Sequence, residues 1–272
     1  MKRILMLVMA VIMTISLAAC GSNDTNTETE GNGQFRVGME AAYAPFNWSQ
    51  QDDSNGGVAI EGSSEFANGY DVQMAKKIAE GLGKELVVVK IEWEGLLPAL
   101  TSGKIDAIIA GMSPTAKRAK AIDFTSPYYE SDLVMVVNEN GPYANATSKA
   151  DFNGASVVAQ LNTFHDSVID QIEGVNHLTP MADFSVMRVA VQSSKADAYV
   201  AERPEAESAQ KAGIGLKMIE LTDGFETSPE DTLVSVGLKK NSEHKAKIDE
   251  ILAGILQEDR DALMLEMQEI QK

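Results

Sequence analysis

Residues 99–110 read Ala99-Leu-Thr-Ser-Gly-Lys-Ile-Asp-Ala-Ile-Ile-Ala110, and residues 190–201 repeat the pattern as Ala190-Val-Gln-Ser-Ser-Lys-Ala-Asp-Ala-Tyr-Val-Ala201. Aligned without gaps, the two stretches share Ala, Ser, Lys, Asp, Ala and Ala at the same positions. Each predicts the end of a helix, a turn and a strand. Two such units can agree by chance, but the shared residues favour a chain of two lobes built alike.

Strand and helix signals alternate around both copies. Valine- and isoleucine-rich runs predict strands, and apolar residues three and four apart predict helices. We expect strands at residues 35–39, 86–91, 107–110, 155–159 and 197–201, and helices at 69–82, 93–102, 163–172 and 184–193. This alternation predicts an α/β fold with mainly parallel sheets. Residues 52–68, rich in Gly, Ser, Asn and Asp, predict a loop or a hairpin insertion.

The first residues indicate export. Two basic residues precede an apolar run at residues 4–17, which ends in Leu17-Ala-Ala-Cys20. This is the pattern of a secretory signal, here residues 1–19, and the run is short for a membrane span. Leu-Ala-Ala-Cys resembles a bacterial lipobox, which implies cleavage before Cys20 and lipid attachment to it. Residues 20–34 are then the lipidated cysteine and a polar, disordered tether.

Composition narrows the possible partners. The 272 residues carry a net charge of −17 and are 44% hydrophobic, enough for one large or two medium domains. Nucleic acid is not an expected partner, because phosphate binding needs clustered Lys and Arg. The negative charge favours solubility over cation capture. The single cysteine allows no intramolecular disulfide. No later segment has the apolar length of a membrane span, so we expect a protein that lies on a membrane without crossing it.

Each copy of the repeat delivers a charged group at the end of its strand. The first is followed by Gly111-Met-Ser-Pro-Thr-Ala-Lys-Arg118 and the second by Glu202-Arg-Pro. In open α/β sheets ligands bind beyond the carboxyl ends of the strands. A cation from one lobe and a carboxylate from the other are complementary to a zwitterion.

Several stretches stand in one order along the chain: Gly38-Met-Glu-Ala-Ala-Tyr-Ala-Pro-Phe46, Gly69-Tyr-Asp71, Gly111-Met-Ser-Pro-Thr-Ala-Lys-Arg118, Asp123-Phe-Thr-Ser-Pro-Tyr128, Ala159-Gln-Leu-Asn-Thr163 and Asp197-Ala-Tyr-Val-Ala-Glu202. Together they resemble the polar amino acid solute-binding proteins of ABC importers, which have the type II periplasmic binding fold. The resemblance covers the chain from residue 35 to its final helix.

The resemblance implies two Rossmann-like lobes joined by a two-strand hinge. Residues 131–138 begin the crossing to the second lobe, and residues 232–238 form the return strand. We therefore expect lobe 1 at residues 35–130 plus 235–272, which includes a helix at 245–256, and lobe 2 at residues 131–234.

The same resemblance assigns the ligand's α-carboxylate to Arg118 and Thr163, and the chemistry of Ser113 and Gly111 makes them candidates beside these two. Arg118 offers a planar guanidinium that can pair both carboxylate oxygens. Ser113, expected at the start of a helix, supplies its hydroxyl and N–H, and Gly111 permits close backbone approach. Thr163 supplies an N–H and a hydroxyl, or serves as an ordinary N-cap. Residues 161–162 are Leu-Asn, where the family usually has a glycine–threonine pair.

The remaining site residues receive the rest of the ligand. Glu202 takes the place of the family carboxylate that binds the α-ammonium. Tyr43 and Trp93 resemble the aromatic pair that encloses the ligand side chain, although either could belong to the core. Glu40 stands where the family often places an acid that binds the far end of a cationic ligand. An acid with two aromatics favours arginine, lysine or ornithine.

Structural roles are the alternatives for these charged residues. Arg118 could pair with Asp123 at the surface, and Glu202 with Arg203 or Lys211.

Two further polar residues are left outside the predicted site. Asp71 is expected to be structural. His165 is expected to face solvent from its helix.

We therefore predict a lipid-anchored, extracytoplasmic solute-binding subunit of an ABC importer, at the periplasmic or cell surface. Hinge closure captures a basic amino acid, and a permease with its ATPase receives it. The chain carries no Gly-x-x-x-x-Gly-Lys loop, so the ATPase is another subunit. We expect a monomer with no metal, cofactor or catalytic residues. The alternatives are a binder of glutamine or cystine, a cyclohexadienyl-type dehydratase, and a ligand sensor.

Overall fold

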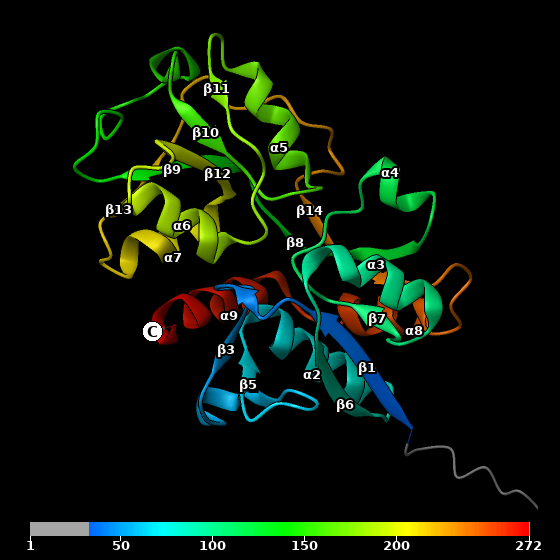
Figure 1. Cartoon of the computed structure of the whole chain (residues 1–272). Coiled ribbons are helices and arrows are strands. Elements are labelled where there is room, and N and C mark those ends of the chain that lie inside the picture. Colours follow the sequence, from blue (N-terminus) through cyan, green and yellow to red (C-terminus); the bar gives the residue numbers. More distant parts are fainter. Residues whose placement is uncertain (1–32, 272) are drawn as a thin grey trace, which may run out of the picture. The chain divides into compact units, whose positions relative to one another are not determined.

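The computed structural model describes residues 33–271. The predicted signal peptide, Cys20 and most of the tether lie outside the described residues, as does Lys272. Two five-stranded sheets dominate the described chain, with helices packed against them (Figure 1).

The first sheet has the order β6-β1-β7-β14-β8. Its parallel strands are β1 (Gln34–Met39), β6 (Glu85–Lys90) and β7 (Ala107–Ile108). β14 (Leu233–Leu238) runs antiparallel between β7 and β8 (Asp123–Glu130). The buried apolar side chains of β1, Phe35, Val37 and Met39, alternate along the strand and therefore share one face of the sheet.

The second sheet repeats this plan with the order β11-β10-β12-β9-β13. β10 (Ser156–Val158), β11 (Asn176–His177) and β12 (Ala198–Glu202) are parallel. β9 (Leu133–Asn138) runs antiparallel between β12 and β13 (Leu216–Ile219). The predicted α/β architecture of two lobes with two connecting strands is therefore observed. The chain crosses from the first lobe to the second between β8 and β9, and it crosses back to the first lobe just before β14.

The repeat seen in the sequence has a structural counterpart. Asp106 lies between α3 and β7, and its carboxylate accepts a hydrogen bond from the Arg36 N–H at 2.8 Å. Asp197 lies at the same place in the second lobe and accepts from the Ser156 N–H, also at 2.8 Å. In both lobes the shared aspartate thus fixes the helix-to-strand turn to the neighbouring parallel strand.

Helices cover the sheets of both lobes. α2 (Tyr70–Gly81), α3 (Trp93–Ser102) and α8 (Lys245–Ala253) belong to the first lobe, with the short α4 (Ala116–Ala119) beyond β7. α5 (Phe164–Val168), α6 (Phe184–Gln192) and α7 (Arg203–Lys211) belong to the second. α9 (Gln257–Ile270) contacts both α2 and α7. Short 3₁₀ turns lie at Ser54–Gly56, Lys149–Phe152 and Ile169–Gln171.

Most predicted elements are confirmed to within a few residues, and the helix at residues 93–102 has the predicted bounds. The predicted helix at 163–172 is instead divided between α5 and a 3₁₀ turn. Val168, Ile169 and Asp170 at the junction are all weak helix formers, which accounts for the tighter last turn.

Residues 42–68 form a small sheet beside the first lobe, so the hairpin alternative for this segment is correct. Its order is β2-β3-β5-β4, with strands Ala42–Tyr43, Asn47–Gln50, Phe66–Asn68 and Val58–Ala59. The antiparallel pairing of β2 with β3 fixes the segment that carries Tyr43.

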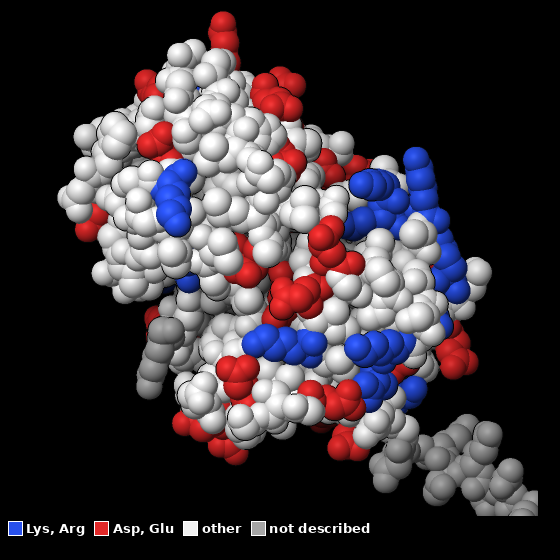
Figure 2. Space-filling model, in the orientation of Figure 1, with Lys and Arg blue, Asp and Glu red and all other residues white. Residues whose placement is uncertain are grey.

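The core consists of a large apolar cluster, which involves residues of both lobes, and a smaller one within the second lobe. Within residues 33–271, none of the helices combines the length and apolar character that a membrane span needs. Figure 2 shows acidic side chains dispersed over the face it presents, with basic side chains in small groups between them.

A buried ion pair joins two helices of the second lobe. Arg188 Nε donates to Glu205 Oε1 at 2.8 Å, and the Tyr199 hydroxyl donates to the same oxygen at 3.1 Å. Glu205 has no exposed surface. Burial raises the pKa of Glu205 even though Arg188 opposes the shift.

Replacing Arg188 by Met should lower the free energy of unfolding by about 3–5 kcal/mol, because it leaves the buried Glu205 without a counter-charge. Urea unfolding of the purified chain measures this change. The double variant Arg188→Met/Glu205→Gln should lose much less, since no charge is then stranded. A single variant within about 1 kcal/mol of wild type would contradict this account of the pair.

Candidate functional site

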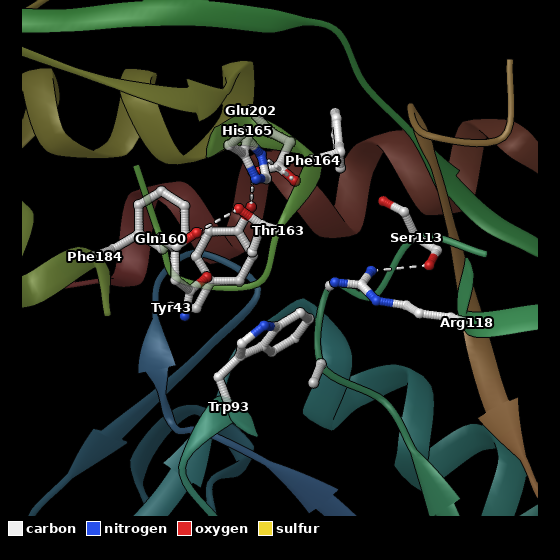
Figure 3. Close-up of a pocket in the computed structure, with 12 residues that line it drawn as sticks. Tyr43, Trp93, Ser113, Arg118, Gln160, Thr163, Phe164, His165, Phe184 and Glu202 are labelled. Carbon is white, nitrogen blue, oxygen red and sulfur yellow. Dashed lines mark hydrogen bonds and ion pairs between the residues drawn. The ribbon is translucent and has the colours of Figure 1, made fainter. Parts of the chain in front are cut away.

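A pocket lies between the lobes, at the carboxyl ends of strands from both sheets (Figure 3). The space left in it is about 10 Å³, roughly the volume that one water needs. All the predicted ligand-binding residues except Glu40 line it. The lining consists of Tyr43, Trp93, Ala110, Gly111, Ser113, Arg118, Gln160, Thr163, Phe164, His165, Phe184 and Glu202.

Arg118 points into the pocket from α4. Its Nη1 donates to the Ser113 carbonyl at 3.0 Å and its Nη2 to the Asn162 carbonyl at 3.3 Å. Its guanidinium carbon lies 4.9 Å from the Trp93 ring centroid, within cation–π range. Burial lowers the pKa of Arg118 to about 10, so it is still a cation at neutral pH. The alternative partner Asp123 instead binds Lys240.

The turn before Arg118 differs in one detail from the prediction. α4 begins at Ala116 with Thr115 as its N-cap, so Ser113 precedes the helix and does not start it. Ser113 is nevertheless buried and lines the pocket. Gly111 has a left-handed φ of 61°, and a Cβ there would lie 2.5 Å from the Tyr43 ring. Both facts explain why this position needs glycine.

Glu202 faces Arg118's side of the pocket from the end of β12. It is 4% exposed, accepts a hydrogen bond from the Tyr43 hydroxyl, and has an oxygen 3.0 Å from His165 Nε2. Burial alone would raise its pKa, but a charge on His165 and the hydrogen bond from Tyr43 bring the pKa of Glu202 below its usual value.

The alternative partners considered for Glu202 are bound elsewhere. Arg203 pairs with Asp132 and Glu220 on the surface. Lys211 donates to Gln268 Oε1 at 3.2 Å.

The prediction that His165 faces solvent is wrong. Its ring is 4% exposed and lies in the pocket, stacked on Phe164 with ring centroids 4.4 Å apart. The edge of the imidazole faces Phe184, 6.2 Å between centroids. α5 is only five residues long, so the spacing of its apolar residues does not predict which side of the helix is buried.

The two predicted aromatics do not face each other. Tyr43 stacks between Phe46 and Phe184, at 4.9 and 4.4 Å between centroids. Trp93 opens α3 and faces Arg118. Phe184 was not singled out from the sequence, because it opens a helix whose other buried residues give only an ordinary core period.

Thr163 lines the pocket, but its hydroxyl does not cap α5. It donates to the Gln160 carbonyl at 2.7 Å and so closes the turn before the helix. Asn162 in this turn has a left-handed φ of 59°. Asparagine tolerates that conformation better than most residues, which gives a physical reason for Asn at this point of the Leu-Asn departure from the family pattern.

Glu40 lies behind the pocket lining at the end of β1. Gln160 Nε2 donates to its carboxylate at 2.9 Å, and Gln160 itself lines the pocket. Burial, aided by the nearby Asp183 and Glu92, outweighs this bond and raises the pKa of Glu40 to about 8. Glu40 therefore contacts the pocket only indirectly, through its hydrogen bond with Gln160. Gln160 belongs to the quoted stretch of residues 159–163, but it was not predicted from the sequence as a site residue.

We also searched the described residues for a possible metal site. His, Asp and Glu side chains of residues 33–271 form no group suited to a metal ion.

The fold and the site are those of an extracellular solute-binding protein. The model of the bacterial extracellular solute-binding proteins, family 3, matches residues 35–265, and the chain belongs to this family. The predicted family and α/β fold class are thereby confirmed, as is an extracytoplasmic location.

Relatives and solved structures agree with this assignment. The chain is 27% identical over 260 residues to the arginine-binding extracellular protein ArtP of Bacillus subtilis, covering 93% of this chain and 92% of the relative. It is 31% identical over 214 residues to a probable histidine-binding protein of Campylobacter jejuni, covering 76% of each.

Among solved structures, it resembles an amino acid ABC transporter substrate-binding protein of Streptococcus pneumoniae bound to L-arginine. The TM-score is 0.74 and the identity 25%, with 88% of this chain and 97% of the other covered. An ancestral arginine-binding protein bound to arginine gives a TM-score of 0.68 and 30% identity, covering 86% and 98%.

Replacing Glu40 by Gln tests its buried, protonated state. The pKa of Glu40 is about 8 in the folded protein against 4.5 ordinarily, so folding favours the protonated carboxyl. Wild-type stability should therefore fall as pH rises from about 4.5 to about 8, by at most about 1.4 kcal/mol per pH unit. Urea unfolding at pH 5 and pH 8 should show a stability advantage of Glu40→Gln that grows with pH. Exposed Glu80, changed in the same way, is the control. An equal advantage at both pH values would refute the buried, protonated carboxyl.

Proposed function

We propose that this protein captures a basic L-amino acid (arginine, lysine or ornithine) and delivers it to an ABC permease. The observation that carries the proposal is the placement of Arg118 and Glu202, one from each lobe, on the same pocket. A fixed cation and a fixed carboxylate on one cavity match the two charged groups of an amino acid, and a ligand with only one of them would leave a buried charge unpaired.

The carboxylate end of the ligand would lie against the first lobe and the turn before α5. Arg118 offers its guanidinium fork, at present bound to the carbonyls of Ser113 and Asn162. Those hydrogen bonds go to neutral carbonyls, which a carboxylate can replace with a bidentate ion pair. The Ser113 hydroxyl, the Thr163 turn and the unobstructed backbone at Gly111 complete this end.

The ammonium end would meet Glu202. The side chain would lie along the Trp93 ring and, in place of Phe184, along the face of Tyr43 that Phe184 now covers. Gln160 with Glu40 behind it would bind the cationic tip. A carboxyl with a pKa of about 8 would ionise when a guanidinium or ammonium approaches, because the opposite charge favours the ionised form.

Entry of the ligand requires the lobes to separate. An amino acid does not fit the enclosed space of about 10 Å³, which adjoins a wider hollow of about 780 Å³ beside Trp93 and Arg118, and contacts between the lobes cross the enclosed space. Hinge bending where β8 passes into β9 and ahead of β14 would open it, with residues 131–234 moving as the second lobe.

The relatives support a basic ligand. ArtP of Bacillus subtilis is named as arginine-binding, and the similar pneumococcal and ancestral structures contain arginine.

A neutral ligand with an amide side chain is the second candidate. A protonated Glu40 both donates and accepts a hydrogen bond, which suits the amide of glutamine as well as a cation. An ancestral arginine-binding protein has also been solved with glutamine, at a TM-score of 0.69 to this chain.

We propose that the chain is a monomeric carrier and not an enzyme, held to the membrane by lipid on Cys20. The Arg118 and Glu202 arrangement is accounted for by binding alone, and the family consists of solute-binding proteins. The permease and its ATPase are separate partners.

Arginine should bind to the full chain in mild detergent, and Arg118→Ala should weaken binding by at least about 30-fold, since truncating one partner of a buried charge pair costs about 2–5 kcal/mol. Thermal shift against the twenty amino acids, ornithine and cystine, followed by calorimetry, measures this. A ligand at one hundred times its Kd adds about 2.7 kcal/mol to the free energy of unfolding.

Arg36→Ala is the matched control, because Arg36 pairs with Glu61 on the surface of the same lobe. It should bind like wild type. A shift only with glutamine or another neutral amino acid would keep the carrier and reject the basic ligand. No shift with any of them would reject amino acid binding.

Replacing Cys20 by Ala should release the protein from the membrane fraction of cells that export it. Each buried methylene of an acyl chain contributes about 0.8 kcal/mol to membrane binding, and the variant has no thiol to acylate. Fractionation with immunodetection measures the change, and Ser22→Ala serves as the control. A Cys20→Ala protein that stays with the membrane would reject the lipid anchor.

A further inference from the structure

His165 is the one histidine whose ring lines the pocket of the described chain; the other two, His177 and His244, do not. Its Nε2 lies 3.0 Å from Glu202 Oε1 as an ion-pair contact, yet neither ring nitrogen has a hydrogen-bond partner of good geometry. A fully buried imidazole with unsatisfied nitrogens is costly to a fold. Packing alone does not account for it, because phenylalanine would fill the same place without that cost.

The groups around the ring are few and can be named. From β12, Glu202 touches it; Phe164 on its own helix and Phe184 from α6 contribute uncharged rings. From β2, the Tyr43 hydroxyl reaches the other oxygen of Glu202. At longer range, the charges that act on this cluster are Arg118 from α4, Asp71 from α2 and Glu205 from α7.

The charge of His165 decides what Glu202 presents to the pocket. An imidazolium beside the carboxylate forms a neutral pair, and a ligand ammonium then meets no net attraction and is repelled by the imidazolium. A neutral imidazole leaves Glu202 as an anion facing the cavity. Imidazole is the side chain whose ordinary titration falls between about pH 5 and 8.

We propose that the charge of His165 controls ligand binding at this site. When His165 is neutral, Glu202 is available to bind the ligand α-ammonium. When His165 is protonated, its imidazolium pairs with Glu202 in place of that ammonium. The inference rests on the proposed amino acid binding and adds to it an exchange of one proton for one ligand. Affinity then falls as pH falls through the imidazole titration, by up to about tenfold per pH unit. The carrier loads in neutral surroundings and releases its ligand in acidic ones.

Calorimetry of L-arginine binding to the full chain between pH 5.5 and 7.5 tests this exchange. Arginine keeps one charge state over this range, so the ligand itself adds no pH dependence. If another amino acid without a titration in this range gives the largest thermal shift, that amino acid is the probe. Wild type should bind at least about tenfold more weakly at pH 5.5 than at pH 7.5. Buffers of different ionisation enthalpy should report close to one more proton released per ligand by wild type than by His165→Gln at the acid end.

Two substitutions separate charge from shape. His165→Gln keeps a neutral N–H donor beside Glu202, and we expect it to bind within a few-fold of wild type at pH 7.5 with the pH dependence reduced by about tenfold. His165→Lys supplies a lasting cation and should bind at least about 100-fold more weakly at pH 7.5. His177→Gln is the matched control, a histidine of the same lobe paired with Asp166 and Asp170, and it should keep the wild-type slope.

Glu40 and Asp71 also titrate with raised pKa values, and their contribution is common to wild type and His165→Gln. The difference between those two slopes therefore belongs to His165. Equal slopes, or a wild-type affinity that does not vary with pH, overturn the proposal while leaving amino acid binding intact. Absence of binding at pH 7.5 for every amino acid in the screen overturns both.

Discussion

The buried carboxylate of Asp71 is the constraint on which the first half of the site depends. It accepts hydrogen bonds from the Tyr128 hydroxyl at 2.6 Å and from Asn47 Nδ2 at 2.7 Å, and it lies in the first turn of α2, where the helix dipole favours negative charge. Asn47 in turn accepts from the N–H of Ala41 at 2.8 Å, which fixes the segment leading to Tyr43. Burial nonetheless raises the pKa of Asp71 to about 6. One charge thus joins strand β8 to the segment that carries Tyr43.

The lobes contribute to the site in different ways. Gly111 and Ser113 belong to a turn held within the first lobe, and their positions do not require contact with the second. Glu202 and Gln160, from the second lobe, are engaged by Tyr43 and Glu40 across the cleft. The proposed hinge opening would therefore break side-chain hydrogen bonds between the lobes, which suits a rigid-body motion about two strands.

The fold was predictable because its signals are local. The repeat carries its turn in the sequence: Gly103 and Ser194 occupy the same position and both have a left-handed φ, 82° and 57°. The placement of Arg118 and Glu202 near the carboxyl ends of two strands was predicted from the order of the strands and helices alone. The orientation of His165 did not, because it depends on packing against Phe184 and Glu202, which are distant in sequence. A five-residue helix is too short for its apolar residues to show a helical period, so the sequence does not predict which face is buried.

The polar groups of this pocket already bind one another, so ligand affinity is a difference between two sets of contacts. In the proposed complex Glu202 would exchange the Tyr43 hydroxyl for an ammonium, and Arg118 would exchange two carbonyls for a carboxylate. Each exchange would replace a neutral partner by one of opposite charge, so that an ion pair forms where only one member of the hydrogen bond was charged. A ligand with a single charge gains at one end only and leaves the other end with its internal partner. In the proposed complex, selectivity for zwitterions would therefore arise from competition within the protein as well as from attraction to the ligand.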